Sequence, residues 1–423
     1  MDDFHYQGHE LYSEKIPIRK IADKVGTPFY LYSYNTILRH FRVFNEAFKS
    51  IPHLTCFAEK ANSNLAILKI FIEEGGGLDI VSGGELYRAL KAGADPQKIV
   101  YAGVGKTKEE ISDALKSNIL MFNVESTQEL LAIDEVASEM KIKARVALRV
   151  NPDIDPNTHQ YIATGLKDSK FGISILNAEK EFEFAESLEN IEVVGIHEHI
   201  GSQITQTAPF LAALEKIITL ADNLRKTGIN IKYINIGGGL GITYKDESPP
   251  HPKELAAELV PTLAKTDYTI IFEPGRVIVG NAGVLVTKVL YTKINEGKNF
   301  IIVDAGMNDL LRPSLYNSFQ KILPVEKSDS SENITADVVG PICESGDFLA
   351  KDRILPKVQR NNLLSVMSAG AYGFTMSSNY NSRRRLPEVL VKDDQYYVIR
   401  EREKYADLIR GEKIPDIFKS WVN

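Results

Sequence analysis

Cysteine is scarce in this sequence of 423 residues, with Cys56 in an apolar stretch and Cys343 in a polar one. Two cysteines cannot form a disulfide framework, and they suit the reducing cytoplasm. The sequence also lacks any apolar run near the roughly 20 residues that span a bilayer. Residues 1–5 are acidic and lack the apolar core of a signal peptide. We therefore expect a cytoplasmic protein without a membrane partner.

A surplus of positive charge is missing as well. The formal net charge is −6, which excludes the basic field needed to hold nucleic acid. The densest basic run, residues 383–385, is too short to change this balance. With 43% apolar and 25% charged residues, the chain has the composition of an ordinary globular protein. Its length allows a large α/β barrel plus a second module.

Short apolar or β-branched runs alternate with amphipathic segments from residue 54 to residue 276. Strands are expected at 54–58, 78–81, 99–102, 121–124, 145–150, 192–199, 233–236 and 268–272. Helices are expected between them, at 64–71, 84–92, 108–116, 127–140, 178–188, 210–226 and 252–265. This alternation of α and β elements favours a (β/α)8 barrel of the TIM type over an open six-stranded sheet.

After Arg276 the pattern changes to strand-like runs separated by polar turns, at 284–291, 300–303, 336–339, 362–367 and 396–399. This pattern indicates a mostly-β C-terminal domain, either a β-sandwich or a Greek-key barrel. Residues 28–34 also look extended and follow a turn signal, so we expect this N-terminal strand to join the β-domain. We predict a barrel over residues 36–280, inserted between residues 1–35 and 281–423.

In such a barrel the working residues lie at the C-terminal ends of the strands. One rim would then collect a lysine, acids, histidines and glycines: Lys60, Asp79, His197, His199, Gly237, Gly238, Gly239 and Glu273. The triple glycine lets backbone N–H groups approach an anion closely, and the loop after the seventh strand is a usual phosphate site of this fold. A lone lysine at a strand end is more often simply solvated, so the interpretation depends on the whole set.

The set matches what pyridoxal phosphate requires of a protein. Lys60 can form a Schiff base with the cofactor, Glu273 can pair with its ring nitrogen, and His199 can stack on its ring. A metal site is the competing interpretation, because His197 and His199 lie two apart and point to the same side of a strand. The other histidines lie away from the strand ends, so we predict no metal. Two buried structural histidines are a third interpretation.

A longer series of motifs resembles the fold-type III, alanine racemase-like family of pyridoxal-phosphate decarboxylases over nearly the whole chain. The motifs are residues 57–64, 79–86, 149–152, 164–165, 170–173, 199–203, 237–239, 273–276, 312–316, 343–347 and 370–373. Each is weak alone, but their number and order together are specific. Within this family the chain looks like the members that decarboxylate meso-diaminopimelate to lysine.

The resemblance implies roles for particular residues. It implies cofactor binding by Lys60, Asp79, His199, Ser202, Gly237, Gly238, Gly239, Glu273, Gly275, Arg276 and Tyr372. It implies substrate binding by Arg276, Arg312, Tyr316, Glu344 and Tyr372, and catalysis by Lys60, His199 and Cys343, with Cys343 as the proton donor. In this family the residues that match Cys343 and Glu344 come from the partner subunit, so the resemblance implies a homodimer with shared active sites.

The expected substrate carries a carboxylate and an ammonium group at each end. Arg312 could bind the distal carboxylate with both arms of its guanidinium, and Glu344 could bind the distal ammonium. Three alternatives remain: a family member acting on arginine, ornithine or carboxynorspermidine, a cofactor carrier without catalysis, and a metal-dependent barrel hydrolase. Two residues depart from the family pattern. Glu59 and Glu198 are acidic, and alternation along the strand predicts that Glu198 points away from the cofactor.

Overall fold

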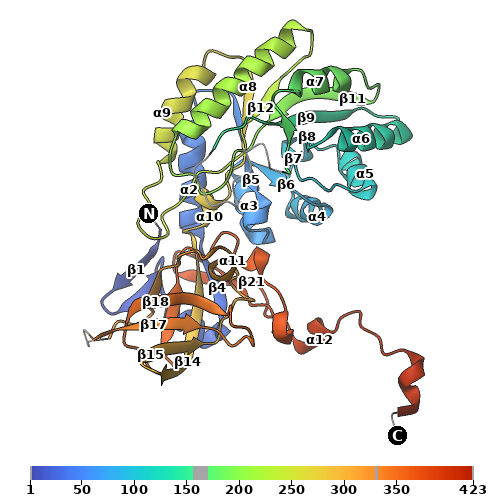
Figure 1. Ribbon diagram of the computed structural model, residues 1–423. Coiled ribbons are helices and arrows are strands. Elements are labelled where there is room, and N and C mark those ends of the chain that lie inside the picture. The colour runs from blue at the N-terminus through green and yellow to red at the C-terminus, as the bar shows by residue number, and fades with distance from the viewer. Residues whose placement is uncertain (1, 156–169, 329–331, 422–423) are drawn as a thin grey trace.

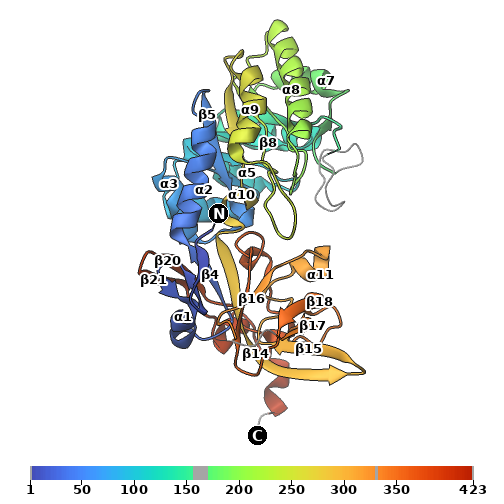
Figure 2. The ribbon, with the colours of Figure 1, turned by 90° about the vertical axis from the view of Figure 1, so that its left-hand side faces the viewer.

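The computed structural model describes residues 2–155, 170–328 and 332–421, so the motif at 164–165 lies outside the described residues. Figures 1 and 2 show a barrel above a second, β-rich unit. Within the described residues, no helix has both the length and the apolar character needed to cross a membrane.

Parallel strands form the barrel, and each is followed by a helix on the outside. The strands are β5 (His53–Ala58), β6 (Gly77–Ile80), β7 (Ile99–Tyr101), β8 (Met121–Val124), β9 (Ala144–Asn151), β11 (Ile191–His197), β12 (Tyr233–Asn235) and β13 (Thr269–Phe272). The barrel closes because β13 pairs with β5. The short strand β10 (Ile173–Ser174) adds to β9 outside this ring.

The helices around the barrel begin at residues that suit helix starts. They are α2 (Tyr34–Ala47), α3 (Leu65–Glu73), α4 (Gly83–Ala92), α5 (Lys108–Ser117), α6 (Thr127–Met140), α7 (Ala178–Glu186), α8 (Ala208–Lys226), α9 (Pro252–Leu263) and the short α10 (Arg276–Val279). Ser82 and Ser126 accept a hydrogen bond from the third residue of their helices, and Thr107 forms a capping box with Glu110. These caps set where the helices begin after the strand-end loops.

Apolar side chains fill the centre of the barrel, and mostly polar side chains fill the layer above them. The lower layer contains Cys56, Met121, Ala147 and Ile271. Because side chains alternate along a strand, residues two positions further on also point into the barrel. The polar members of this upper layer are Asp79, Asn123, Arg149, His197, Asn235 and Glu273, all buried. The fold thus places a ring of polar groups at the carboxyl ends of the strands.

The second unit is a mixed sheet with the order β18-β17-β15-β14-β4-β20-β21, in which β19 also pairs with β14 and β16 pairs with β19. Its elements are β4 (Phe29–Ser33), β14 (Gly283–Asn295), β15 (Lys298–Val303), α11 (Arg312–Tyr316), β16 (Ile322–Pro324), β17 (Asn333–Val339), β18 (Phe348–Pro356), β19 (Leu363–Val366), β20 (Glu388–Lys392) and β21 (Gln395–Arg400). Strand β4, which precedes the barrel in the chain, lies between β14 and β20.

The two ends of the chain flank this sheet. The N-terminal elements are β1 (Phe4–Gln7), β2 (Glu10–Ser13), β3 (Ile16–Pro17) and α1 (Ile18–Val25), and α12 (Tyr405–Leu408) lies near the other end. Apolar residues of the first segment, such as Leu11 and Ile18, pack with Val284 and Val389 of the sheet. The segment after β21 runs away from the body of the molecule (Figure 1).

The predicted fold class is confirmed: a parallel α/β barrel with a mostly-β second unit that takes an N-terminal strand. The barrel strands differ from the predicted ones by at most two residues at either end. Seven strands were not predicted, namely β1, β2, β3, β10, β16, β18 and β20. Strand β18 carries Lys351, Asp352 and Arg353 at its centre and pairs with irregular register, so it lacks an alternating pattern. The boundaries at residues 36 and 280 remain predictions.

Candidate functional site

Glu273 lies at the centre of the polar layer, directly after β13. Its Oε1 atom accepts hydrogen bonds from Nδ2 of Asn235 (2.6 Å) and of Asn123 (3.2 Å). Nε2 of the buried His197 lies 3.6 Å from its Oε2 atom. Burial would raise the pKa of Glu273, but His197, the Lys60 charge and the Asn235 hydrogen bond outweigh burial and hold this pKa below its usual value. Glu273 is therefore an anion at neutral pH.

Lys60 lies in a single 3₁₀ turn, Glu59–Ala61, that directly follows β5. Its Nζ atom donates to Oδ2 of the buried Asp79 at 2.6 Å. Burial would lower the pKa of Lys60, but the charges of Asp79 and Glu273 raise it. The second oxygen of Asp79, Oδ1, has no hydrogen-bond partner among the described residues. The amine is thus held at the rim by Asp79, and the charge of Glu273 adds to its pKa.

The glycine loop after β12 packs against His199 without room for side chains. A Cβ atom at Gly237 would lie 2.6 Å from Nδ1 of His199, and one at Gly238 would collide with the carbonyl of Glu273. The backbone N–H of Gly238 donates to Nδ1 of His199 at 3.1 Å. Burial, followed by the charges of Arg149 and Lys60, lowers the pKa of His199 well below its usual value. The imidazole is therefore neutral.

The site fits pyridoxal phosphate. Among the described residues, nothing accepts a hydrogen bond from the backbone N–H of Gly239 or of Gly275, and buried N–H groups normally have a partner. Both lie beside the lysine-bearing rim, where a phosphate dianion would satisfy them. Ala58 and Ala61 would lie 3.1 Å from a Cβ atom at Gly275, so this glycine brings the backbone close to the Lys60 turn.

Hydrogen bonds tie the loop that carries Lys60 to the second unit. They run from Asn62 Nδ2 to the carbonyl of Gly370 (3.2 Å), from the N–H of Tyr372 to the carbonyl of Ala61 (2.9 Å), and from Asn64 Nδ2 to Glu388 Oε2 (2.8 Å). Tyr372 has a φ of 56°, a left-handed conformation that is unusual for a bulky residue. The second unit thus holds both the lysine loop and Tyr372 in place.

Two buried arginines lie beside this junction. Arg276 and Arg312 are each 6% exposed, and neither has a carboxylate partner within 4.0 Å in the described part of the chain. Arg276 donates from Nη2 to Ser202 Oγ (2.9 Å) and from Nη1 to the hydroxyl of Tyr244 (2.7 Å). Burial lowers the pKa of Arg312. Two buried guanidiniums without a counterion make a binding site for an anion.

Cys343 and Glu344 lie on an exposed loop between β17 and β18. The Asp347 carboxylate fixes this loop by accepting hydrogen bonds from the backbone N–H groups of Met307 and Ile342, both at 2.6 Å. Among the described residues, the Glu344 carboxylate accepts only from the N–H of Gly346, at 3.4 Å. Among the described residues, no hydrogen bond or ion pair joins either residue to Lys60. Tyr316, at the end of α11, is half-buried.

The predicted site residues thus fall into a group at the barrel rim and a group on the exposed loop that carries Cys343 and Glu344. The structure brings together the residues at the barrel rim with two residues of the second unit, Tyr372 and Arg312. The rim residues are Lys60, Asp79, His199, Ser202, Gly237, Gly238, Gly239, Glu273, Gly275 and Arg276. The sequence interpretation missed Asn123, Asn235 and Tyr244. Asn123 and Asn235 could have been found, because each lies at an inward position near the end of a predicted strand. Tyr244 lies in an irregular loop that has no periodicity to place it.

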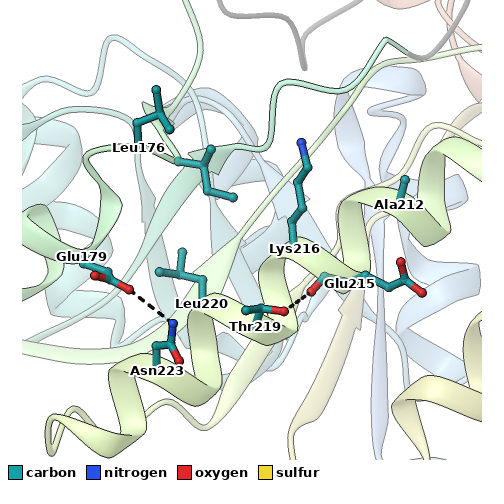
Figure 3. A pocket seen from close by; sticks show the side chains of 9 residues that line it. Leu176, Glu179, Ala212, Glu215, Lys216, Thr219, Leu220 and Asn223 are labelled. Atoms are coloured by element: carbon teal, nitrogen blue, oxygen red, sulfur yellow. Dashed lines mark hydrogen bonds between the residues drawn. The ribbon is translucent and has the colours of Figure 1, made fainter.

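Two further features of the described residues bear on this site: candidate metal ligands and a hollow elsewhere on the barrel. In residues 2–155, 170–328 and 332–421, no three His, Cys, Asp or Glu side chains are grouped to hold a metal ion. A hollow of about 680 Å³ lies between α7 and α8 (Figure 3). Leu176, Lys216 and Leu220 line it, and it contains none of the predicted site residues.

Both acids that depart from the family pattern are buried. Glu59 is 0% exposed, and its carboxyl oxygens have no hydrogen-bond partner among the described residues. Burial, together with nearby Glu85, raises the pKa of Glu59 to about 9. Burial also raises the pKa of Glu198 to about 8, although Arg149 lowers it. Both carboxyls are therefore mainly neutral at pH 7, and the orientation predicted for Glu198 remains a prediction.

Known proteins resemble this chain over nearly its whole length. Residues 34–280 match the family described as pyridoxal-dependent decarboxylase, pyridoxal binding domain. A diaminopimelate decarboxylase of Aquifex aeolicus is 53% identical over 405 residues, or 96% of each chain. The structure of a diaminopimelate decarboxylase of Helicobacter pylori complexed with L-lysine has a TM-score of 0.90 and 44% identity, covering 93% of this chain and 98% of that one. An M. jannaschii diaminopimelate decarboxylase in co-complex with L-lysine has a TM-score of 0.93 and 38% identity, covering 98% of both chains.

Because Glu59 is neutral in the folded chain, we predict that the free energy of unfolding depends on pH. Its pKa in the folded chain lies above the ordinary value of 4.5, so unfolding releases a proton at pH values between the two. The free energy of unfolding should then fall by up to about 1.4 kcal/mol for each pH unit between about pH 5 and pH 9. We expect Glu59→Gln to remove the part of this dependence that comes from Glu59 and to raise the thermal midpoint by about 5 °C at pH 8, with little change at pH 5.

Thermal unfolding followed by circular dichroism measures this effect. Glu189→Gln, at an exposed position, is the control and should leave the pH dependence unchanged. A Glu59→Gln protein with the same slope as the parent protein would show that Glu59 is ionised in the folded chain.

Proposed function

The chain belongs to the family of pyridoxal-dependent decarboxylases, and we propose that it converts meso-diaminopimelate to lysine and carbon dioxide, the last step of lysine biosynthesis. This is a carboxy-lyase reaction. The observation that carries the proposal is the placement of Lys60, Glu273 and the glycine loop at one rim, next to two buried arginines that have no carboxylate partner among the described residues. The first group serves the cofactor and the second serves the substrate.

The rim residues would hold pyridoxal phosphate. Lys60 would bind it covalently through its amine, and His199 would stack on the ring. Glu273 would hold a proton on the ring nitrogen, because this carboxylate stays ionised in its buried site. The phosphate would be held by a set of hydroxyl and backbone groups: Ser202, Gly237, Gly238, Gly239, Gly275, Arg276 and Tyr372. When bound, the cofactor supplies an electron sink for the pair of electrons that a departing carboxylate leaves behind.

Residues of the protein would control the protons. Asp79 and Glu273 keep the Lys60 amine charged before the cofactor binds, and a proton must leave this amine before it can act as a nucleophile. Cys343 would give a proton from its Sγ atom to the α-carbon of the product. Because His199 is neutral, it would add no positive charge next to the cofactor ring. The proton on the ring nitrogen, held by Glu273, would then determine how strongly the ring withdraws electrons.

The two arginines explain the choice of substrate. Diaminopimelate keeps a carboxylate and an ammonium group at the end that does not react, and L-lysine, the product, keeps the same end. Arg276 and Arg312 present guanidiniums that a carboxylate would neutralise. Tyr316 would contribute to the same pocket, and Glu344 would bind the distal ammonium. The relatives from H. pylori and M. jannaschii were solved with L-lysine, which supports an amino-acid ligand for this chain.

A homodimer would complete each site. Cys343 and Glu344 lie on an exposed loop of the chain, where they could reach a second copy. We therefore propose that each chain contributes these two residues to the site built around Lys60 of the partner. A cytoplasmic location also remains our prediction, supported by two free cysteines, Cys56 and Cys343.

A panel of substrates tests the reaction. We expect release of carbon dioxide from meso-diaminopimelate and little from ornithine, arginine, lysine or carboxynorspermidine. Arg312→Lys should lower kcat/KM for meso-diaminopimelate by about 10- to 100-fold, because the ammonium cannot bind a carboxylate with two parallel hydrogen bonds. Arg42→Lys, which alters an exposed ion pair with Glu74, is the control. Equal release from ornithine and meso-diaminopimelate would contradict the proposed specificity.

Mixing two inactive proteins tests the shared site. Lys60→Ala and Cys343→Ala should each be nearly inactive alone. Random reassociation makes about half of the dimers mixed, and each mixed dimer has one intact site, so we expect about a quarter of the parent activity. Refolding the proteins together, followed by an assay of carbon dioxide release, measures this recovery. If the mixture stays inactive although mixed dimers form, Cys343 acts within its own chain. If Cys343→Ala is fully active alone, Cys343 has no catalytic role.

A further inference from the structure

Tyr244 lies between the two buried arginines and contacts both. The Arg312 guanidinium lies over its ring, with Cζ 4.5 Å from the ring centroid. Its hydroxyl accepts a hydrogen bond from Arg276 Nη1 at 2.7 Å. Tyr244 is itself only 7% exposed. One neutral side chain thus holds two cations that would otherwise repel each other in a buried site.

We propose that Tyr244 is a specificity-determining residue that fixes Arg276 and Arg312 as a pair for one carboxylate and donates its own hydroxyl proton to that carboxylate. The inference deepens the proposed function and rests on it, because it assigns the carboxylate to the non-reacting end of diaminopimelate. Tyr244 has no such role in the family resemblance described above.

The hydrogen bonding of Tyr244 supports this role. A phenolic oxygen can accept and donate at the same time. In the described part of the chain, the Tyr244 hydroxyl accepts from Arg276 and donates to no acceptor. Its proton is therefore available beside the Arg276 guanidinium, on the same ring that Arg312 covers. A carboxylate bound there would receive hydrogen bonds from three side chains.

The chemistry of tyrosine also suits an anion site better than an acid would. An aspartate or glutamate at this position would pair with the arginines and compete with the ligand. The negative face of an aromatic ring attracts a guanidinium without neutralising its charge. The pocket therefore keeps the full charge of Arg276 and Arg312 for the substrate.

Tyr244 lies on the same segment of the chain as the glycine loop, Gly237 to Gly239. The Gln203 side-chain amide holds this segment through the backbone of Ile242, with hydrogen bonds of 2.6 and 3.1 Å. The carboxylate of Glu247 accepts from the N–H groups of Tyr244 (2.9 Å) and Lys245 (2.7 Å). The segment that starts at Gly237 thus ends with Tyr244 held in a fixed place. The three glycines expected to contact the phosphate and Tyr244, proposed to contact the distal carboxylate, thus lie on one segment after β12.

Binding of two ligands tests the proposal in the cofactor-loaded protein. L-lysine carries the distal carboxylate, whereas 1,5-diaminopentane has the same chain without any carboxylate. Tyr244→Phe keeps the ring under Arg312 and removes only the hydroxyl. We expect its Kd for L-lysine, measured by calorimetry, to rise about 10-fold, as the loss of one charge-assisted hydrogen bond predicts. Its Kd for 1,5-diaminopentane should change less than about 2-fold.

Kinetics and a matched control complete the test. Tyr244→Phe should raise KM for meso-diaminopimelate about 10-fold and leave kcat within about 2-fold. Tyr244→Leu, which also removes the ring, should have a larger effect, and the phenylalanine variant should recover part of it. Tyr268→Phe is the control, because Tyr268 is also buried beneath an arginine, Arg225, with Cζ 3.9 Å from the ring centroid.

Two results would overturn the proposal: unchanged L-lysine affinity in Tyr244→Phe, or an equal loss of affinity for both ligands. Either would leave Tyr244 a structural residue. Failure of the proposed function itself would appear differently, because the parent protein would then neither bind L-lysine nor release carbon dioxide from meso-diaminopimelate.

Discussion

The site depends on keeping one carboxylate, Glu273, ionised inside the barrel. A buried charge is costly unless other groups compensate for it. Here two amides donate hydrogen bonds to Glu273, His197 lies beside it, and Lys60 supplies a positive charge nearby. The barrel makes this possible, because each of these groups lies at the carboxyl end of a different strand. A buried anion, a charged amine and a glycine loop are thereby brought to one rim.

The second unit contributes residues and hydrogen bonds to the site at the barrel rim. It holds the loop after Lys60 through Asn62 and Asn64, and it supplies Tyr372 and Arg312. The barrel side of the site is suited to the cofactor, and the junction of the two units is suited to the substrate. The insertion of the barrel after β4 explains this arrangement, since β4 and β14 form adjacent strands in the sheet and keep both ends of the barrel close to it.

Much of this architecture could be predicted from the residues alone. The barrel strands are short apolar runs with clear boundaries, and alternation along them places Asp79 and Glu273 inside. Pairing partners in space are harder to predict. The positions of Asn123 and Asn235 near strand ends could be predicted, but their shared partner, Glu273, is evident only in the structure. Tyr244 lies in a loop without a repeating pattern. Strand β18 has a polar centre and an irregular register, so its sequence resembles a loop. The roles expected of Cys343 and Glu344 rest only on the resemblance, because among the described residues no hydrogen bond or ion pair joins either of them to Lys60.

Chemical trapping tests the central claim most directly, namely that the amine of Lys60 is the group that binds pyridoxal phosphate. The loaded protein would be reduced with sodium borohydride, digested, and analysed by peptide mass spectrometry. The account predicts a pyridoxyl group on the peptide that contains Lys60, and none on that peptide in Lys60→Arg. A pyridoxyl group on another lysine, with Lys60 unmodified, would contradict it.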